Sequence, residues 1–242
     1  MNERAVVFEN VFNFRDLGGY RGADGRTVRW GRLFRADDLC RLDDADLTRL
    51  GELGVRTVID LRRPDEIERH GRVAPAAHTY LHAQVEHLEW PAAEFPTPES
   101  RVDYLVERYL EMTELGGAGI ALALRTIADP DAAPAVFHCA AGKDRTGLVA
   151  AFTLHVLGVA EDDIADDYAL SERAEEAGWA WWSARHPEPL TRRWEIYTVT
   201  PREAMIAVFD ALRERHGSVE KYLASIGVTA EHAAAMRGHL LD

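Results

Sequence analysis

Residues 138–147 read His-Cys-Ala-Ala-Gly-Lys-Asp-Arg-Thr-Gly, and they join a short apolar run to a helix-like segment. The run Ala135–His138 is typical of a buried strand, and residues 148–157 are apolar almost all round, which indicates a helix inside the protein. Between them, successive backbone N–H groups can wrap a tetrahedral anion, and the start of the helix adds partial positive charge. We therefore expect Cys139 to lie at the floor of an anion pocket.

Arg145 stands six residues after Cys139, where its planar fork can clamp two oxygens of such an anion. The same positive field favours the thiolate of Cys139, which is the nucleophilic form. The spacing alone carries little information, because a chain with two cysteines and 26 arginines produces it about one time in five. The whole string, set between a strand and a helix, indicates a cysteine nucleophile. The alternative is a buried structural thiol.

These ten residues resemble the signature loop of the cysteine-dependent protein tyrosine phosphatases. The Gly-Lys-Asp before the arginine resembles a bacterial subgroup that includes secreted phosphatases of pathogens. Residues 13–20 with Leu33–Arg35, and then residues 58–62 with Glu66, match that subgroup in order, so the resemblance spans nearly the whole chain. It implies phosphotyrosine and, in some members, phosphoinositide substrates, a phosphocysteine intermediate, and no metal or other cofactor.

The resemblance also assigns roles within the pocket. The phosphate is expected to bind to Ala140, Ala141, Gly142, Lys143 and Thr146, and the Thr146 hydroxyl to hydrogen-bond the thiolate. Asp60 is also expected to contact the substrate. The leaving oxygen needs a proton from a nearby carboxyl group, and the candidates are Asp144 and Asp60. The resemblance favours Asp144, because the subgroup lacks the separate mobile aspartate loop of animal enzymes. The alternative for Asp60 is an ion-pair partner that positions Arg62 or Arg145.

Lys143 is one of two lysines in a chain with 26 arginines. A lysine at this place indicates a compact, rotatable charge that faces the pocket and suits a second phosphate, as in a phosphoinositide headgroup. The alternatives are a solvated lysine at the loop tip and, for Thr146, an ordinary cap in the first helical turn. His138 is expected to tune the loop by hydrogen bonding, because no second ligand stands at metal spacing.

Three further features bear on the site. Arg62 and Glu66 are spaced for a helical i,i+4 pair, and we expect a salt bridge that braces the pocket. Cys40 is expected to be a buried free thiol, the alternative being a protective disulfide with Cys139. Some subgroup members fold a helical lid over the pocket, and residues 160–200 are a candidate for one. The alternative is plain core packing of the tryptophans in this segment.

Composition sets the broad class. A chain of 242 residues, 47% hydrophobic and 29% charged, is typical of one globular domain over residues 1–242. A net charge of −13 argues against nucleic acid and stable membrane association, and no run approaches the ~20 apolar residues of a membrane span. Without a signal-peptide pattern or a disulfide framework, we expect a cytoplasmic protein. The sequence leaves the oligomeric state open.

Strand and helix patterns alternate along the chain. Helices are predicted over residues 42–53, 101–115 and 118–128, and strands over 55–61 and 78–82. Thr200–Glu203 reads as a capping box with Pro201 in the first helical position. This order predicts a single α/β domain with a mostly parallel central sheet flanked by helices, and a nucleophile at the carboxyl end of a strand.

The patterns together predict a phosphatase that acts on phosphotyrosine, and also on phosphoserine, phosphothreonine or phosphoinositide esters. A module that binds phospho-ligands without turnover is the alternative, disfavoured because Cys139, Arg145 and two acids are all present. Sulfur transfer would not need an arginine at the sixth position. Arsenate reduction normally needs further cysteines, and only Cys40 is available.

Overall fold

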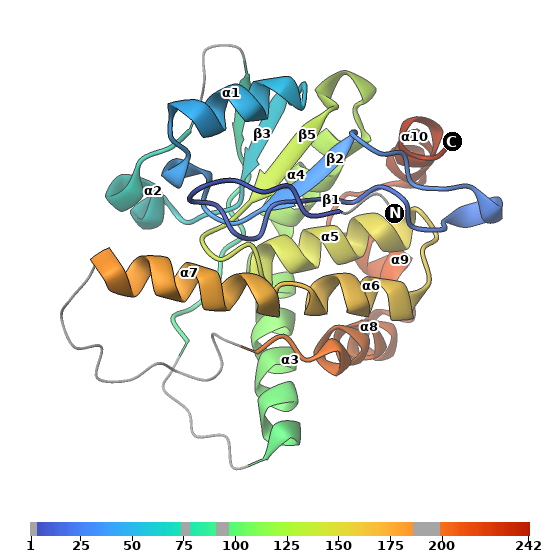
Figure 1. Cartoon of the computed structure of the whole chain (residues 1–242). Helices are drawn as coiled ribbons and strands as arrows, with labels where there is room; N and C mark the ends of the chain where they lie inside the picture. The colour runs from blue at the N-terminus through green and yellow to red at the C-terminus, as the bar shows by residue number, and fades with distance from the viewer. Residues whose placement is uncertain (1–3, 74–77, 91–96, 186–198) are drawn as a thin grey trace.

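The computed structural model describes residues 4–73, 78–90, 97–185 and 199–242. Its sheet has five strands in the order β1–β2–β5–β3–β4 (Figure 1). The strands are β1 (Arg15–Asp16), β2 (Leu33–Ala36), β3 (Thr57–Asp60), β4 (Thr79–His82) and β5 (Ala135–His138). Only β1 runs antiparallel to its neighbour among these strands, so the prediction of a mostly parallel sheet is confirmed.

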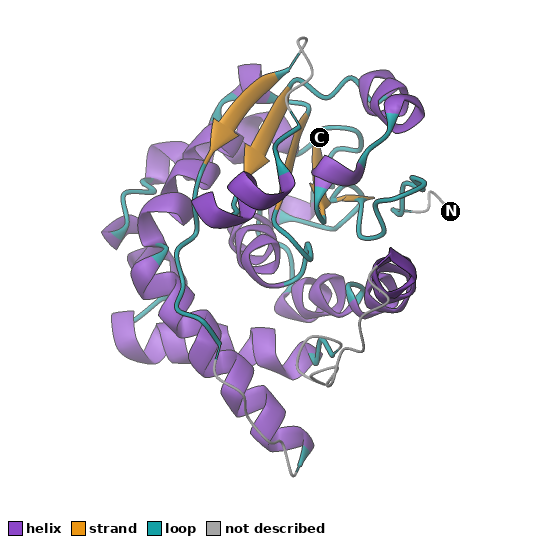
Figure 2. Cartoon of the chain, turned by 90° about the vertical axis from the view of Figure 1, so that its left-hand side faces the viewer, coloured by secondary structure: helices purple, strands orange, loops and turns teal. Residues whose placement is uncertain are grey.

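Helices pack around the sheet, with the larger group on one face (Figures 1 and 2). They are α1 (Asp44–Glu52), α2 (Pro64–His70), α3 (Pro98–Leu115), α4 (Gly117–Ala128), α5 (Asp144–Val156), α6 (Glu161–Ala169), α7 (Glu172–Arg185), α8 (Arg202–His216), α9 (Val219–Ser225) and α10 (Ala230–Leu240). The predicted α/β class is confirmed. No described helix combines the length and the apolar character needed to cross a membrane.

Local capping explains several helix ends. Asp43 accepts hydrogen bonds from two amides at the start of α1, and Ser218 accepts one at the start of α9. The predicted capping box at residues 200–203 is wrong. Pro201 itself occupies the N-cap of α8, and the hydroxyl of Thr200 donates to the carbonyl of Ala169 at 3.1 Å. The long-range partner at the end of α6 thus replaces the local one.

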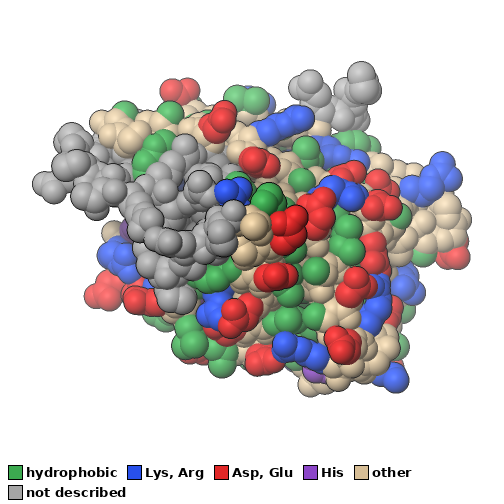
Figure 3. All heavy atoms as spheres, turned by 90° about the horizontal axis from the view of Figure 1, so that it is seen from below, with side chains coloured by type: hydrophobic (Ala, Val, Ile, Leu, Met, Phe, Trp, Pro, Cys, Tyr) green, Lys and Arg blue, Asp and Glu red, His purple; other side chains and the backbone are tan. Residues whose placement is uncertain are grey.

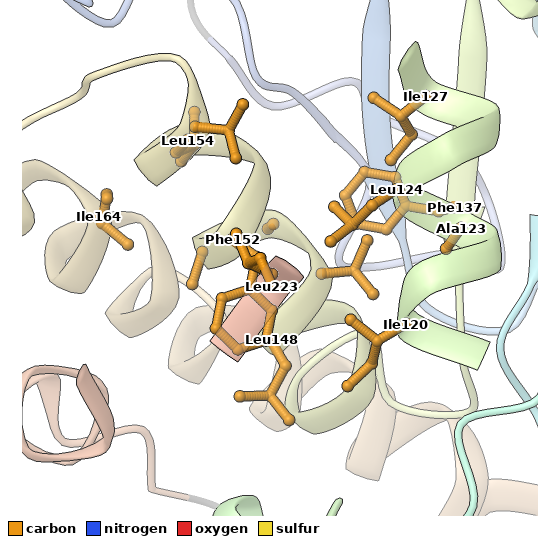
Figure 4. Packing of buried hydrophobic residues seen from close by; sticks show 14 of the residues in the cluster. Ile120, Ala123, Leu124, Ile127, Phe137, Leu148, Phe152, Leu154, Ile164 and Leu223 are labelled. Carbon is orange, nitrogen blue, oxygen red and sulfur yellow. The ribbon is translucent and has the colours of Figure 1, made fainter. Parts of the chain in front are cut away.

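The three central strands, β2, β5 and β3, are buried on both faces, and alternate strand residues enter different cores. Phe137 of β5 lies beside Leu124 of α4, in the same buried cluster as Ile120 of α4 and Phe152 of α5 (Figure 4). Its neighbour Val136 enters a smaller cluster on the other face, which α1 and the N-terminal segment cover. α5 is buried along nearly all its length, as its apolar sequence predicts. The central strand and the helix after it are therefore held rigidly on all sides.

The strand register brings chemistry-bearing residues to one edge. His138 at the end of β5 pairs with Ala36 on one side and with Asp60 on the other. Since the carboxyl ends of these parallel strands align, the residues that follow them meet at the same edge of the sheet. Cys139 follows the central strand. Figure 3 shows acidic and basic side chains interspersed over the described part of one face. The chain carries a net charge of −13, so an anion pocket would be a local positive feature of an acidic protein.

Candidate active site

The loop between β5 and α5 holds the predicted nucleophile. The Cys139 side chain is 1% exposed, and α5 begins five residues later, so the loop amides and the helix N-terminus surround the same space. Gly142 has a φ of +67°, a conformation that residues with a side chain rarely adopt. A Cβ atom there would lie 2.6 Å from the backbone nitrogen of Asp37. Glycine is therefore required where the loop crosses the end of β2.

We expect Gly142→Ala to destabilise the protein more than any alanine placed in open left-handed backbone. The conformation costs a residue with a side chain about 1–2 kcal/mol, and the clash with the backbone of Asp37 adds about 1–3 kcal/mol. Gly54→Ala is the matched control, because Gly54 has a φ of +68° and a Cβ atom added there would meet no other atom within 4 Å. Urea unfolding measures both. Equal losses would show that the loop shifts to admit the methyl group.

Arg145 is oriented by a carboxylate from another element. Its Nη1 and Nη2 donate to Glu66 of α2 at 2.5 and 2.9 Å. Burial opposes the charge of Glu66, but the hydrogen bonds and charge of Arg145 lower the pKa of this carboxyl to about 2. The predicted salt bridge between Arg62 and Glu66 is therefore wrong: Glu66 braces the arginine of the loop instead. The residues that do pair, Glu66 and Arg145, are 79 positions apart in the chain, so the local i,i+4 spacing did not identify the partner.

Asp144 lies at the pocket with a tyrosine behind it. The hydroxyl of Tyr109 donates to its carboxylate at 2.6 Å, and the same hydroxyl lies 2.6 Å from that of Tyr168. Burial and the neighbouring charge of Asp144 raise the pKa of Tyr109 well above its ordinary value, so this tyrosine stays a neutral donor. Nothing in the sequence pattern identified the two tyrosines. Their hydroxyl groups fix the direction of the Asp144 carboxyl group.

Asp60 has a different environment. It is fully buried, and it accepts hydrogen bonds from the Arg62 guanidinium and from the Tyr80 hydroxyl at 2.9 Å. Burial opposes ionisation, but the hydrogen bonds from Arg62, the His138 ring when it is protonated and the charge of Arg62 lower the pKa of Asp60 to about 2. Arg62 also reaches Asp38 at 3.0 Å, so it joins the ends of β2 and β3. This geometry favours the positioning role for Asp60 over the role of acid.

We expect Asp60→Asn to lower the free energy of unfolding at pH 7 by about 3–5 kcal/mol, because Arg62 would keep a buried charge without its main partner. The pKa of Asp60 is lowered from 3.8 to about 2 by folding, so its contribution is complete above about pH 4 and disappears as the pH falls through 2. The difference between variant and parent should shrink over that range in denaturant titrations. Asp103→Asn, at an exposed site, is the control. A difference that stays constant with pH would contradict the linkage.

The structure places two further residues of the loop, Lys143 and Thr146. Lys143 is 1% exposed, so the alternative of a solvated lysine at the loop tip is wrong. Its ammonium lies 3.8 Å from the Asp144 carboxylate. Thr146 is fully buried in the first turn of α5, and its hydroxyl has no hydrogen-bond partner among the described residues. Its bond to the thiolate therefore stays a prediction.

His138 and Cys40 flank the site without facing it. Burial lowers the pKa of His138, which keeps the ring neutral, and its Nε2 lies 3.7 Å from Asp60. Cys40 and Cys139 are both free thiols, so no disulfide protects the nucleophile in this structure. Cys40 is half-buried and donates to the carbonyl of Gly71 at 2.9 Å. Burial, followed by the charge of Asp38, raises its pKa to about 11.

A cavity of about 470 Å³ opens above the loop. The loop itself contributes Ala140 and Ala141, and the charged walls include Asp144 and Arg145. The remaining described lining residues are Arg63, Glu66, His87, Glu89, Trp90 and Met112. Lys143 and Asp60, which we predicted to contact the substrate, are not among the described residues that line it. Cys139 is buried between the end of the central strand and these two alanines in the chain.

The candidate lid segment is described in part. α6 and α7 cover residues 161–185, and the rest of 160–200 lies almost wholly outside the described residues, including Trp194. Trp179 lines a second cavity, of about 270 Å³, which shares Ala140 and Ala141 with the first. Trp181 donates its indole N–H to Asn10 at 2.7 Å. A closing motion of this segment stays a prediction.

A sequence model of the tyrosine phosphatase family matches residues 6–242, which is nearly the whole chain. A protein of Cupriavidus necator that bears the name of a tyrosine-protein phosphatase is 35% identical over 177 residues, covering 69% of this chain and 63% of its own length. The triple specificity protein phosphatase PtpB of Mycobacterium tuberculosis is 29% identical over 277 aligned positions, covering 96% and 97%. A tyrosine-protein phosphatase of Nostoc commune is 30% identical and covers 85% and 73%.

Proposed function

This chain belongs to the tyrosine phosphatase family, and on that basis we propose that it hydrolyses phosphotyrosine and related phosphate monoesters through a phosphocysteine intermediate. The resemblance inferred from the signature loop is thereby confirmed at the level of the family. One observation carries the proposal furthest. Arg145 and Asp144 line one cavity, and the buried Cys139 directly precedes in the chain the two alanines that form part of its wall.

In the first step, the Cys139 thiolate attacks phosphorus and the bond to the ester oxygen breaks. Arg145 and the loop amides stabilise the negative charge of the equatorial oxygens in the transition state. The leaving oxygen takes a proton from Asp144, whose carboxyl group lines the same cavity and is held by Tyr109. The products of this step are an alcohol or phenol and a thiophosphate ester on Cys139.

In the second step, water attacks the phosphocysteine. The Asp144 carboxylate takes a proton from that water, the sulfur–phosphorus bond breaks, and the thiolate returns with release of inorganic phosphate. The two steps restore the protonation state of both residues. Every proton transfer therefore involves only Asp144, the ester oxygen and water.

The cavity walls support an aromatic ester as the preferred substrate. Trp90 and Met112 also line the cavity and add apolar atoms to its wall, against which a phenyl ring can pack. Trp90 is itself held edge-on by Tyr104, with ring centroids 6.0 Å apart. The phosphoinositide alternative depended on Lys143, which is buried and does not line the described part of the cavity. We therefore place phosphotyrosine first.

Phosphate release from a panel of substrates tests the proposal. The panel contains a phosphotyrosine peptide, a phosphoserine peptide and vesicles that carry phosphoinositides, each assayed with the parent and with Cys139→Ser. We expect the tyrosine ester to react fastest and all release to require Cys139. Binding of the peptide without release by the parent would favour the binding-module alternative. Faster release from the vesicles would reverse the order of substrates.

Two esters whose leaving groups differ in acidity distinguish Asp144 from Asp60 as the general acid. Asp144→Asn is expected to slow hydrolysis of phenyl phosphate by about 10²–10⁴-fold, because a poor leaving group needs the proton. It should slow 4-nitrophenyl phosphate much less, since that phenolate leaves without help. The ratio of the two kcat/KM values is the measurement. If Asp144→Asn slowed both esters equally while Asp60→Asn changed the ratio, the acid would be Asp60.

A further inference from the structure

A buried ionic cluster behind the loop has no part in the chemistry proposed for the site. Its centre is Asp167 of α6, whose side chain is 1% exposed. The carboxylate accepts from Nε of Arg15 at 3.0 Å and from Nη1 of Arg35 at 2.6 Å, and Tyr20 donates its hydroxyl at 3.2 Å. One carboxylate thus gathers side chains from the two N-terminal motif stretches, residues 13–20 and 33–35.

Arg15 and Arg35 connect the Asp167 carboxylate to the loop. Nη2 of Arg35 donates to the carbonyl oxygen of Gly142 at 2.7 Å. Arg15 donates to the Oδ1 atom of Asn13, and this fixes the amide so that its Nδ2 donates to the carbonyl oxygen of Ala141 at 3.1 Å. Two consecutive carbonyl groups of the loop are therefore held toward the cluster.

The position of these carbonyls sets the direction of the next two amides. In a trans peptide the C=O bond and the following N–H bond point in opposite directions. Holding the carbonyls of Ala141 and Gly142 toward the cluster turns the N–H groups of Gly142 and Lys143 away from it. The N–H groups of Ala140, Ala141 and Gly142 donate to no protein acceptor among the described residues. Donors left in this way are available to an anion in the loop.

We infer that Asp167 is a positioning residue: through Arg35 and through Arg15 and Asn13, it holds the anion-binding amides of the loop in place before the phosphate arrives. Donors that are already oriented stabilise a developing charge without reorganising during the reaction. The inference rests on the proposed function for the nature of the anion. It also gives a physical role to residues 13–20 and 33–35, the two N-terminal motif stretches that contribute side chains to this cluster.

Tungstate binding tests the inference without turnover. Tungstate is a tetrahedral dianion, and calorimetry on proteins that also carry Cys139→Ser measures its affinity directly. We expect Asp167→Asn and Asn13→Ala each to weaken tungstate binding by about 10–100-fold, the range typical of residues that orient a ligand-binding group from behind. Asn13→Ala removes the contact with the Ala141 carbonyl and leaves both arginine pairs with Asp167 in place.

Two controls separate positioning from general destabilisation. Tyr20→Phe removes a hydrogen bond to the same carboxylate but none that leads to the loop, so it should leave the affinity within about twofold of the parent. Leu212→Ala opens the core beneath α8, and its lower unfolding midpoint should come without a change in affinity. Circular dichroism melts identify any variant that does not fold. If Asp167→Asn does not fold, Asn13→Ala decides alone.

Either folded test variant with an affinity within about twofold of the parent would overturn the inference, as would a parent that binds no tungstate. Weak binding by Leu212→Ala to the same degree would also overturn it, because the effect would then follow stability. Failure of the proposed function looks different. If the Cys139→Ser protein binds tungstate in the expected Asn13-dependent way, yet the protein with Cys139 intact releases phosphate from no ester, the phosphatase would be refuted and the positioning role would stand.

Discussion

Cys139→Ser is expected to abolish phosphate release, with kcat lower by at least about 10⁴-fold. The serine hydroxyl is a far weaker nucleophile than a thiolate. Among the described residues, no contact places a base beside it to remove its proton. Arg145, the loop amides and the cavity walls stay in place. The variant should therefore still bind a phosphotyrosine peptide, which fluorescence anisotropy measures, while a phosphate assay measures the lost turnover.

Cys40→Ser is the matched control for that loss. The hydroxyl of a serine can replace the hydrogen bond from Cys40 to the carbonyl of Gly71, and burial raises the pKa of the Cys40 thiol to about 11, so it is not a thiolate at neutral pH. We expect this variant to keep nearly the full activity of the parent. Comparable activity in Cys139→Ser would exclude the phosphocysteine mechanism, and loss in Cys40→Ser alone would move the chemistry to the other thiol.

The features predicted correctly from the sequence are those with local causes. The buried strand, the tight loop and the apolar helix at residues 135–157 each carry their own signal of period, glycine and composition. The helix starts at Asp43 and Ser218 have an equally local cause, because one side chain accepts hydrogen bonds from amides two or three residues ahead. For the same reason, Cys139 and Arg145 could be related through a loop of five residues.

The contacts that the sequence could not predict join residues far apart along the chain. Arg62 and Glu66 have the right spacing for a pair, but each finds a better-placed partner once the strand ends align. The contact between Arg15 and Asp167 spans 152 residues and leaves no trace in any local pattern. A buried charge takes the partner that desolvation and geometry allow, and only the assembled sheet brings that partner into reach.

Arg145→Lys is expected to lower kcat by about 10³-fold or more, although the charge is kept. The arginine spends one N–H of each terminal nitrogen on Glu66, and its remaining donors can still form a second fork toward phosphate oxygens. A lysine has a single nitrogen and cannot serve Glu66 and two oxygens in fixed directions. Removing one such oriented donor typically costs about 10²–10³-fold in kcat, and here two are lost.

Glu66→Gln tests whether activity depends on the direction of the Arg145 guanidinium as well as on its charge. Glutamine keeps the size of the side chain, but it accepts through one oxygen only, so Arg145 loses half of its anchor and all of its ion pair. We expect a loss of about 10–100-fold in kcat/KM, smaller than that of Arg145→Lys. Steady-state kinetics on a phosphotyrosine peptide compares the two. If Glu66→Gln matched the parent while Arg145→Lys lost activity, the arginine would act through its own rotamer preference and the carboxylate would be dispensable.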